Sequence, residues 1–312
     1  MSKFKQFHPE KLRDYPLESR HSKVSAADFG RPLDQDSFST FVDSLPNILA
    51  ARDLRDLAAA IGAARSAGKA IIWAFGGHVV KAGLGPVMID LMDRGFVTAL
   101  ATNGSGVIHD FEIALCGNTS EDVEQELKTG RFGMARETGE YLNEAVSQGA
   151  CQEKGMGESI AEFVARREPR HARLSLLVAS QRLNIPLTVH VAIGTDIIHN
   201  HPAASGEALG KGSLIDFRIL THQISQLHEG GVYINLGSAV ILPEVFLKAV
   251  SMVRNSGRRL ENFTTANLDF IQHYRPFQNV LKRPVAGSGK GIAITGHHEI
   301  MLPLLAAMLV HC

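Results

Sequence analysis

Six short runs of consecutive apolar residues, each followed by a segment with helical spacing, constrain the fold more than any other feature of this sequence. Strands that are apolar throughout are buried on both faces, which is typical of parallel sheets covered by helices. The pattern therefore predicts an α/β fold: an open, doubly wound, mostly parallel sheet of six or more strands with helices on both faces. The predicted strands are 70–75, 96–101, 185–193, 232–236, 263–266 and 292–295. The predicted helices are 84–94, 107–116, 172–183, 213–228, 242–254 and 298–310.

The remainder of the chain indicates one domain with an extension. Residues 1–45 are polar and contain Pro9, Pro16 and Pro32, which break any long element. Residues 46–312 show no linker, internal repeat or low-complexity tract. We expect an N-terminal extension over 1–45 and a single α/β domain over 46–312.

Charge and apolar content limit the partners to expect. The chain has 32 basic and 32 acidic residues, so it offers no basic field for nucleic acid. Its start lacks the apolar core of a secretory signal, and its longest apolar run, 300–310, is short and contains Pro303. Cys116, Cys151 and Cys312 form no paired motif. These features favour a cytoplasmic protein without a membrane or nucleic-acid partner.

Glycine-rich segments follow three of the predicted strands. In open parallel sheets ligands bind at the carboxyl ends of strands, where glycine lets backbone amides approach a phosphate and a helix N-terminus adds positive charge. The three ends together predict a nucleotide. No G-x-G-x-x-G follows a strand, and the glycine-rich stretch 287–291 lacks essential residues of a phosphate loop. The three segments are Gly76-Gly77-His78, Asn103-Gly104-Ser105-Gly106 and Gly237-Ser238.

From about residue 70 to 310 the order of these motifs resembles the deoxyhypusine synthase superfamily. The segment TNGSGVIHD (102–110) is similar to the family's Thr-Thr-Ala-Gly-Gly-Val-Glu-Glu-Asp. The segment NIPLTVHVAIGTD (184–196) is similar to its strand leading to a Thr-Asp. Further likenesses lie in 232–240, in 264–266 and in 294–305, which shares a Pro-Leu-Leu. The chain is identified as a divergent member of that superfamily.

The resemblance implies a tetrameric NAD-binding enzyme that takes hydride from a polyamine and passes a butylamine group through an imine on a lysine. That lysine corresponds to Lys282, and the family's acidic residue beside the nicotinamide corresponds to His109, which can still move a proton. With Asp196 these are the predicted catalytic residues. The predicted NAD contacts are Gly77, His78, Asn103, Gly104, Ser105, Gly237, Ser238, Thr265 and Ala266.

Departures from the family pattern concentrate on the substrate side. The Trp-Gly before the family lysine is Val280-Leu281 here, its histidine after the glycine-rich strand is Pro243, and an aspartate of its last strand is His297. Several amine-binding carboxylates are thus missing. We expect NAD to be retained and deoxyhypusine formation to be lost. The expected protein is an NAD-dependent transferase or oxidoreductase that removes hydride from an amine or related small molecule, as a homotetramer or homodimer.

An inserted loop supplies further candidates. Asp196 and Asp216 flank it, and either aspartate fits the family's cofactor role. The predicted substrate-binding residues are His199, His201, Asp216 and His297. A metal-dependent hydrolase is an alternative, because imidazoles of His199, His201, His297 and His298 suit zinc, iron or manganese, although no HExxH motif is present. A non-catalytic nucleotide-binding protein is the third reading.

Overall fold

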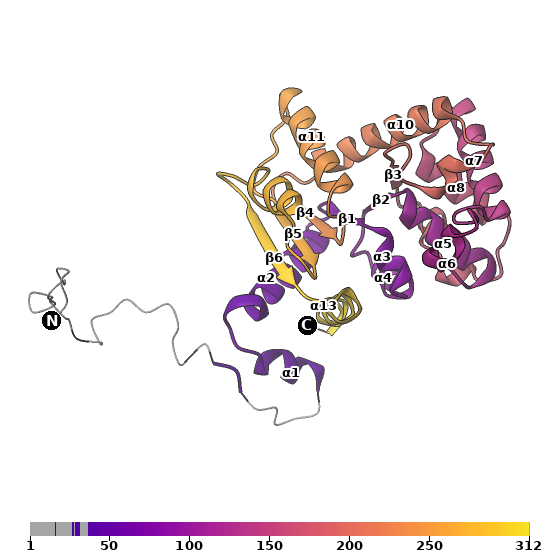
Figure 1. Cartoon of the computed structure of the whole chain (residues 1–312). Helices are drawn as coiled ribbons and strands as arrows, with labels where there is room; N and C mark the ends of the chain where they lie inside the picture. Colours follow the sequence, from indigo (N-terminus) through magenta and orange to yellow (C-terminus); the bar gives the residue numbers. More distant parts are fainter. Residues whose placement is uncertain (1–15, 17–26, 28, 32–36, 312) are drawn as a thin grey trace, which may run out of the picture.

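The centre of the molecule is a six-stranded parallel sheet (Figure 1). The computed structural model describes residues 16, 27, 29–31 and 37–311. The strand order is β3-β2-β1-β4-β5-β6, so the direction of winding reverses between β1 and β4. All five neighbouring pairs are parallel, which confirms the predicted open, doubly wound sheet. The strands are β1 (Ile71–Phe75), β2 (Ala99–Asn103), β3 (Leu187–His190), β4 (Val232–Leu236), β5 (Thr264–Asp269) and β6 (Lys290–Thr295).

Helices cover both faces of this sheet. One core forms beneath α2 (Leu49–Ser66), α4 (Gly85–Asp93), α5 (Gly104–Cys116), α9 (Leu176–Leu183) and α13 (His298–His311). The other forms beneath α10 (Gly206–Ser225), α11 (Ile241–Asn255) and the helical segment η6 (Phe277–Lys282), which directly follows α12 (Tyr274–Pro276). In Figure 1, α10 and α11 lie above the sheet, and α2, α4 and α13 lie below it.

The central strand shows why the sequence folds this way. Ile71, Trp73 and Phe75 pack into the first core, while Ile72 and Ala74, between them, pack into the second. Side chains of a strand point alternately to the two faces, so a strand without polar residues needs cover on both. All five side chains are at most 1% exposed. The same rule explains why each predicted apolar run is a strand.

A group of small helices interrupts the alternation between β2 and β3. It contains α6 (Val123–Leu127), α7 (Arg136–Cys151), α8 (Met156–Ala165) and the short turn η4 (Ala172–Leu174). The start of α8 lies against the outer strand β3 so closely that a Cβ at Gly157 would come within 1.8 Å of the Leu187 carbonyl oxygen. The helix thereby covers an edge that would otherwise be open to pairing with another chain.

The structure differs from the sequence expectation at the starts of two helices. Helix α5 begins at Gly104 rather than 107, and α10 begins at Gly206 rather than 213. The short helix α3 (Gly77–Lys81), which was not predicted, begins directly after Gly76. Two of the three glycine-rich segments are therefore first helical turns, whereas Gly237-Ser238 lies outside any helix, between β4 and the next helix α11. Most of the predicted extension 1–45 lies outside the described residues, but α1 (Phe38–Ser44) packs on α13 and places Val42 in the first core. None of the helices within the described ranges is long and apolar enough to cross a membrane.

Candidate functional site

A pocket of about 220 Å³ opens at the carboxyl ends of β2 and β3. It brings together three residues predicted from sequence: Ser105 and His109 on α5, and Asp196 on the loop after β3. Lys81 of α3 lines it as well, with Glu112 and Glu121. Its apolar lining consists of Ile108, Val123, Phe132 and Ile197.

A larger cavity, of about 440 Å³, lies at the opposite end of β3. It is lined by Pro186 and Leu187 at the start of that strand, and by Glu158 and Glu162 of α8. Ligand sites of open parallel sheets lie at the carboxyl ends of strands, where loops and helix N-termini converge. The smaller pocket is therefore the candidate functional site.

His109 is a pocket residue whose pKa the protein environment lowers strongly. Burial, reinforced by the positive charge of Lys81, lowers its pKa from 6.5 to about 4. Its Nδ1 lies 2.7 Å from the Thr119 hydroxyl. A Cβ at Gly77 would lie 3.1 Å from the ring carbon Cδ2, so α3 and α5 meet closely at this point. An imidazole that is neutral near pH 7 can accept a proton.

Asp196 occupies the amino-terminal end of α5. A Cβ at Gly104 would come within 2.3 Å of its Oδ2, and the backbone N–H of Ser105 hydrogen-bonds to this carboxylate. Burial raises the pKa of Asp196 above its usual range, and Oδ2 has no hydrogen-bond partner among the described residues. The carboxylate thus stands where an anionic ligand of this helix would bind.

The ends of β1 and β4 meet closely next to this pocket. A Cβ at Gly76 would lie 2.8 Å from the Gly237 carbonyl oxygen, and Gly237 itself has φ +71, which favours glycine. His78 is exposed beside this junction, and the Ser238 hydroxyl accepts a hydrogen bond from Leu242 N of α11. Four predicted cofactor contacts, Gly77, His78, Gly237 and Ser238, thus meet where the strand order reverses.

Known structures share the fold of this chain. No family model matches the sequence, and no curated protein matches it. A protein from Entamoeba histolytica assigned as a deoxyhypusine synthase superposes with TM-score 0.54 at 11% identity, over 90% of this chain and 96% of its own. The chain has a deoxyhypusine-synthase-like fold. The family resemblance read from the sequence is confirmed at the level of the fold.

Two further structures share the deoxyhypusine-synthase-like fold at low identity. A conserved Methanococcus maripaludis S2 protein assigned as LOR/SDH gives TM-score 0.53 at 15% identity, over 84% of this chain and 70% of its own. The ternary complex of AgrE with ornithine and NAD+ gives TM-score 0.54 at 15% identity, over 82% of this chain. The chain spans about a third, 32%, of the length of AgrE.

The strand-end residues of β5 differ from those expected. Thr265 and Ala266 lie near the start of β5, fully buried, and the Thr265 hydroxyl donates to the Val280 carbonyl. The residue of β5 that reaches the carboxyl edge is Asp269, and His298 at the start of α13 lies beside it, Nε2 to Oδ1 3.9 Å. The apolar pattern fades after 266, so the sequence offered no signal for this pair.

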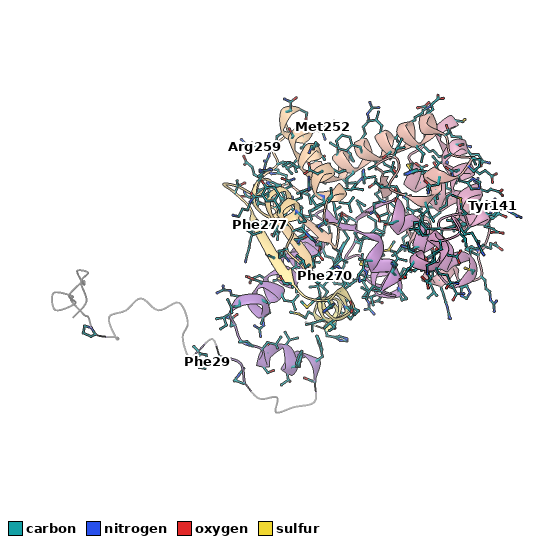
Figure 2. All side chains as sticks on the ribbon, in the orientation of Figure 1. Phe29, Tyr141, Met252, Arg259, Phe270 and Phe277 are labelled. Atoms are coloured by element: carbon teal, nitrogen blue, oxygen red, sulfur yellow. The ribbon has the colours of Figure 1, made fainter. Side chains whose placement is uncertain are left out.

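The structure does not bring Lys282 to the pocket. Its side chain is exposed on η6, with Nζ 4.4 Å from the centre of the Phe277 ring. The preceding residues, Val280 and Leu281, contact the first residues of β5 and β6. Figure 2 shows Phe277 on the opposite side of the molecule from Tyr141 of α7, the helix that packs near the pocket. The catalytic role predicted for Lys282 finds no support in this geometry.

The histidine cluster required for a metal-dependent hydrolase does not form. His199 and His201 follow β3, whereas His297 and His298 follow β6, and these strands are the two opposite edges of the sheet. Strands lie about 4.8 Å apart, so five spacings separate the two pairs by roughly 24 Å. Within residues 37–311 and the few described before them, no three His, Cys, Asp or Glu residues are placed to hold a metal ion. This alternative was wrong.

Other predicted substrate residues have structural partners. The Nδ1 atom of His199 accepts hydrogen bonds from the backbone of Gly194 and Asp196. His201 packs against α7, where a Cβ at Gly139 would come within 2.4 Å of its ring. His297 is exposed and stacks parallel to Phe270 at the β5–β6 edge of the sheet, away from the pocket. Likewise, the Asn103 side chain is engaged, because its Oδ1 accepts from Ser105 Oγ and Gly106 N.

Asp216 is completely buried and holds two elements together. Its Oδ2 accepts hydrogen bonds from Gly157 N at the start of α8 and from Val189 N of β3. Burial raises its pKa to about 7. The structure places Asp216 outside the lining of the pocket, so of the two aspartates that flank the inserted loop only Asp196 reaches it.

Proposed function

We propose that this chain is an NAD-dependent enzyme, an oxidoreductase or transferase, that removes hydride from an amine or related small molecule. The supporting observation is the pocket in which a neutral histidine, His109, and a buried carboxylate, Asp196, meet at the carboxyl ends of a parallel sheet. AgrE, which shares the fold, has been solved with ornithine and NAD+.

The junction of the β1 and β4 ends is where we place the phosphates of a dinucleotide. Gly77 begins helix α3 at this junction, and a helix N-terminus attracts phosphate groups. Because Asp196 already stands at Gly104, the phosphates are proposed to lie over Gly77, His78, Gly237 and Ser238, with Ser105 at the flank. NAD bound there would accept the hydride.

The pocket itself suits a small amine. Its volume of about 220 Å³ is below the roughly 300–1,000 Å³ of pockets that enclose drug-sized ligands. Asp196 and Glu121 contribute negative charge to its walls. In the proposed reaction the substrate carbon loses hydride, and His109 accepts the proton from the substrate nitrogen or oxygen. The substrate becomes an imine or a carbonyl compound, and Asp196 stabilises positive charge on the nitrogen.

Thermal unfolding with and without millimolar NAD+ tests the cofactor. A ligand bound only by the folded state stabilises it by about 2.7 kcal/mol at one hundred times its Kd, so the Tm is expected to rise. NADH fluorescence with a panel of small amines then tests hydride removal. His109→Ala is expected to keep the NAD+ shift and lose turnover.

An unchanged Tm with NAD+ and its relatives would remove the basis of the proposal. A Tm shift without turnover, together with an unaltered host phenotype for His109→Ala and Asp196→Asn, would instead favour a non-catalytic nucleotide-binding protein.

A further inference from the structure

A chain of hydrogen bonds lies behind His109, in the wall of the pocket. The His109 Nδ1 is 2.7 Å from the Thr119 Oγ1, which donates to Glu112 Oε2 at 2.5 Å. The other carboxylate oxygen of Glu112 accepts from the Thr138 hydroxyl at 3.1 Å. The four residues come from α5, from the loop after it and from α7. Sequence reasoning singled out only His109.

The chemistry of these groups fixes the direction of each bond. An ionised carboxylate only accepts hydrogen bonds, and a hydroxyl has a single proton to donate. Thr119 gives its proton to Glu112, so it can only accept from the imidazole. The proton of the neutral His109 ring must therefore lie on Nδ1, and its lone pair lies on Nε2. Thr138 occupies the second oxygen of Glu112 and holds the carboxylate in place.

We propose that Thr119 and Glu112 are positioning residues that hold His109 in the Nδ1–H tautomer, with Nε2 as the proton acceptor of the pocket. This rests on the proposed role of His109 as the base. When Nε2 takes the proton, an imidazolium forms 4.0 Å from the Glu112 carboxylate, which stabilises it through Thr119. The side chains of His109 and Glu112 are 17% and 15% exposed, so little water competes for these bonds.

The tautomer can be measured directly by nitrogen-15 NMR of labelled histidine side chains, without NAD or substrate. Wild-type His109 is expected to show a protonated Nδ1 and an unprotonated Nε2. Thr119→Ser keeps the hydroxyl and is expected to keep this pattern. Thr119→Val removes the acceptor, and Glu112→Gln can donate to Thr119 and turn its proton towards Nδ1. Both are expected to shift the ring towards the Nε2–H form.

A wild-type His109 protonated at Nε2, or an unchanged pattern in folded Thr119→Val, would overturn the proposal. The exposed Thr129, whose hydroxyl donates to the Glu126 carbonyl, provides the matched control: Thr129→Val is expected to change nothing. Since the NMR measurement needs no turnover, it tests the tautomer of His109 whether or not the proposed function is correct.

Enzyme kinetics provide a second test of the positioning role. With hydride transfer as the readout, Thr119→Val and Glu112→Gln are expected to lower kcat on the order of 10²- to 10⁴-fold while KM stays near the wild-type value. Thr119→Ser is expected to restore kcat. A loss of folding alone would be seen in the emission of Trp73. Full kcat in both variants would contradict the positioning role even with the tautomer as assigned.

Discussion

At the scale of the residue, the environment of His109 decides what it can do. Burial and the charge of Lys81 place its pKa at about 4, so the ring is neutral across the physiological range. A base with this pKa acts at any pH well above 4, and activity is expected to fall only as pH drops through that value. The same depressed pKa weakens the folded state in acid, because between pH 6.5 and about 4 the unfolded chain binds more protons.

Replacing Lys81 tests this electrostatic environment. Lys81→Met removes a positive charge that disfavours the imidazolium, so the pKa of His109 is expected to rise while staying below 6.5, since burial is the larger cause. The acid limb of the pH–rate profile and the NMR titration of His109 are expected to move together to higher pH. The exposed Lys128, outside the pocket lining, provides the control Lys128→Met. An unchanged or lower titration midpoint for His109 in Lys81→Met would contradict the prediction.

The sequence predicted the site residues that follow a strand end, but it did not predict those that are brought together only by tertiary packing. His109 and Ser105 could be predicted because they follow a recognisable strand end. Thr119 and Thr138 could not, since each belongs to a segment without a motif and meets Glu112 only after α5 and α7 pack. Thr265 was matched to the family at the end of the predicted strand 263–266, whereas β5 continues to Asp269.

At the scale of the element, periodicity predicted the strands because burial on both faces requires continuous apolar residues. It placed two helix starts too late. Glycine is read as a helix breaker, yet α5 and α10 begin at Gly104 and Gly206. The reason at α5 is packing: a Cβ at Gly104 would meet Asp196, and one at Gly106 would come within 2.0 Å of the Thr102 hydroxyl. Such contacts exist only in the folded chain.

Two glycines in helices provide a matched test of this packing. Gly157→Ala would push a methyl group into the Leu187 carbonyl, an immobile backbone atom, and is expected to destabilise the protein by about 3 kcal/mol as α8 shifts from β3. Gly210→Ala on α10 meets no atom within 4 Å and is expected to stabilise by up to about 1 kcal/mol. Urea unfolding measures both. Equal changes in the free energy of unfolding for the two variants would show that α8 does not pack closely against β3 at Gly157.

At the scale of the whole molecule, the fold could be predicted further than the reaction. Strand order and helical layers follow from burial patterns, and the fold persists in solved structures at 11% and 15% identity. The substrate does not follow from them, because part of the pocket wall, Glu121, Val123 and Phe132, comes from the segment between α5 and α7, where no family motif lies.

We propose that the protein is a homodimer or homotetramer. The segment after β5 exposes large apolar side chains, Phe270 at 50%, Ile271 at 52% and Tyr274 at 68%, and Phe270 can be seen in Figure 2. Light scattering is expected to give a multiple of 33.8 kDa, and Ile271→Glu with Tyr274→Glu is expected to lower that mass. Met252→Glu, at a side chain 46% exposed on α11, is the control. A wild-type monomer would contradict this.

The parallel pairing of β1 with β4 affects how the chain folds during its synthesis. Its partners are far apart in the chain, Ile71 pairing with Val232 and Phe75 with Leu236. A ribosome therefore releases β1, β2 and β3 long before β4, and until then β1 is an unprotected edge strand of a half-built sheet. Long-range pairing of this kind closes slowly. The proposed phosphate site is thus completed late in synthesis, and a chain interrupted before residue 236 would have an aggregation-prone edge at β1 instead.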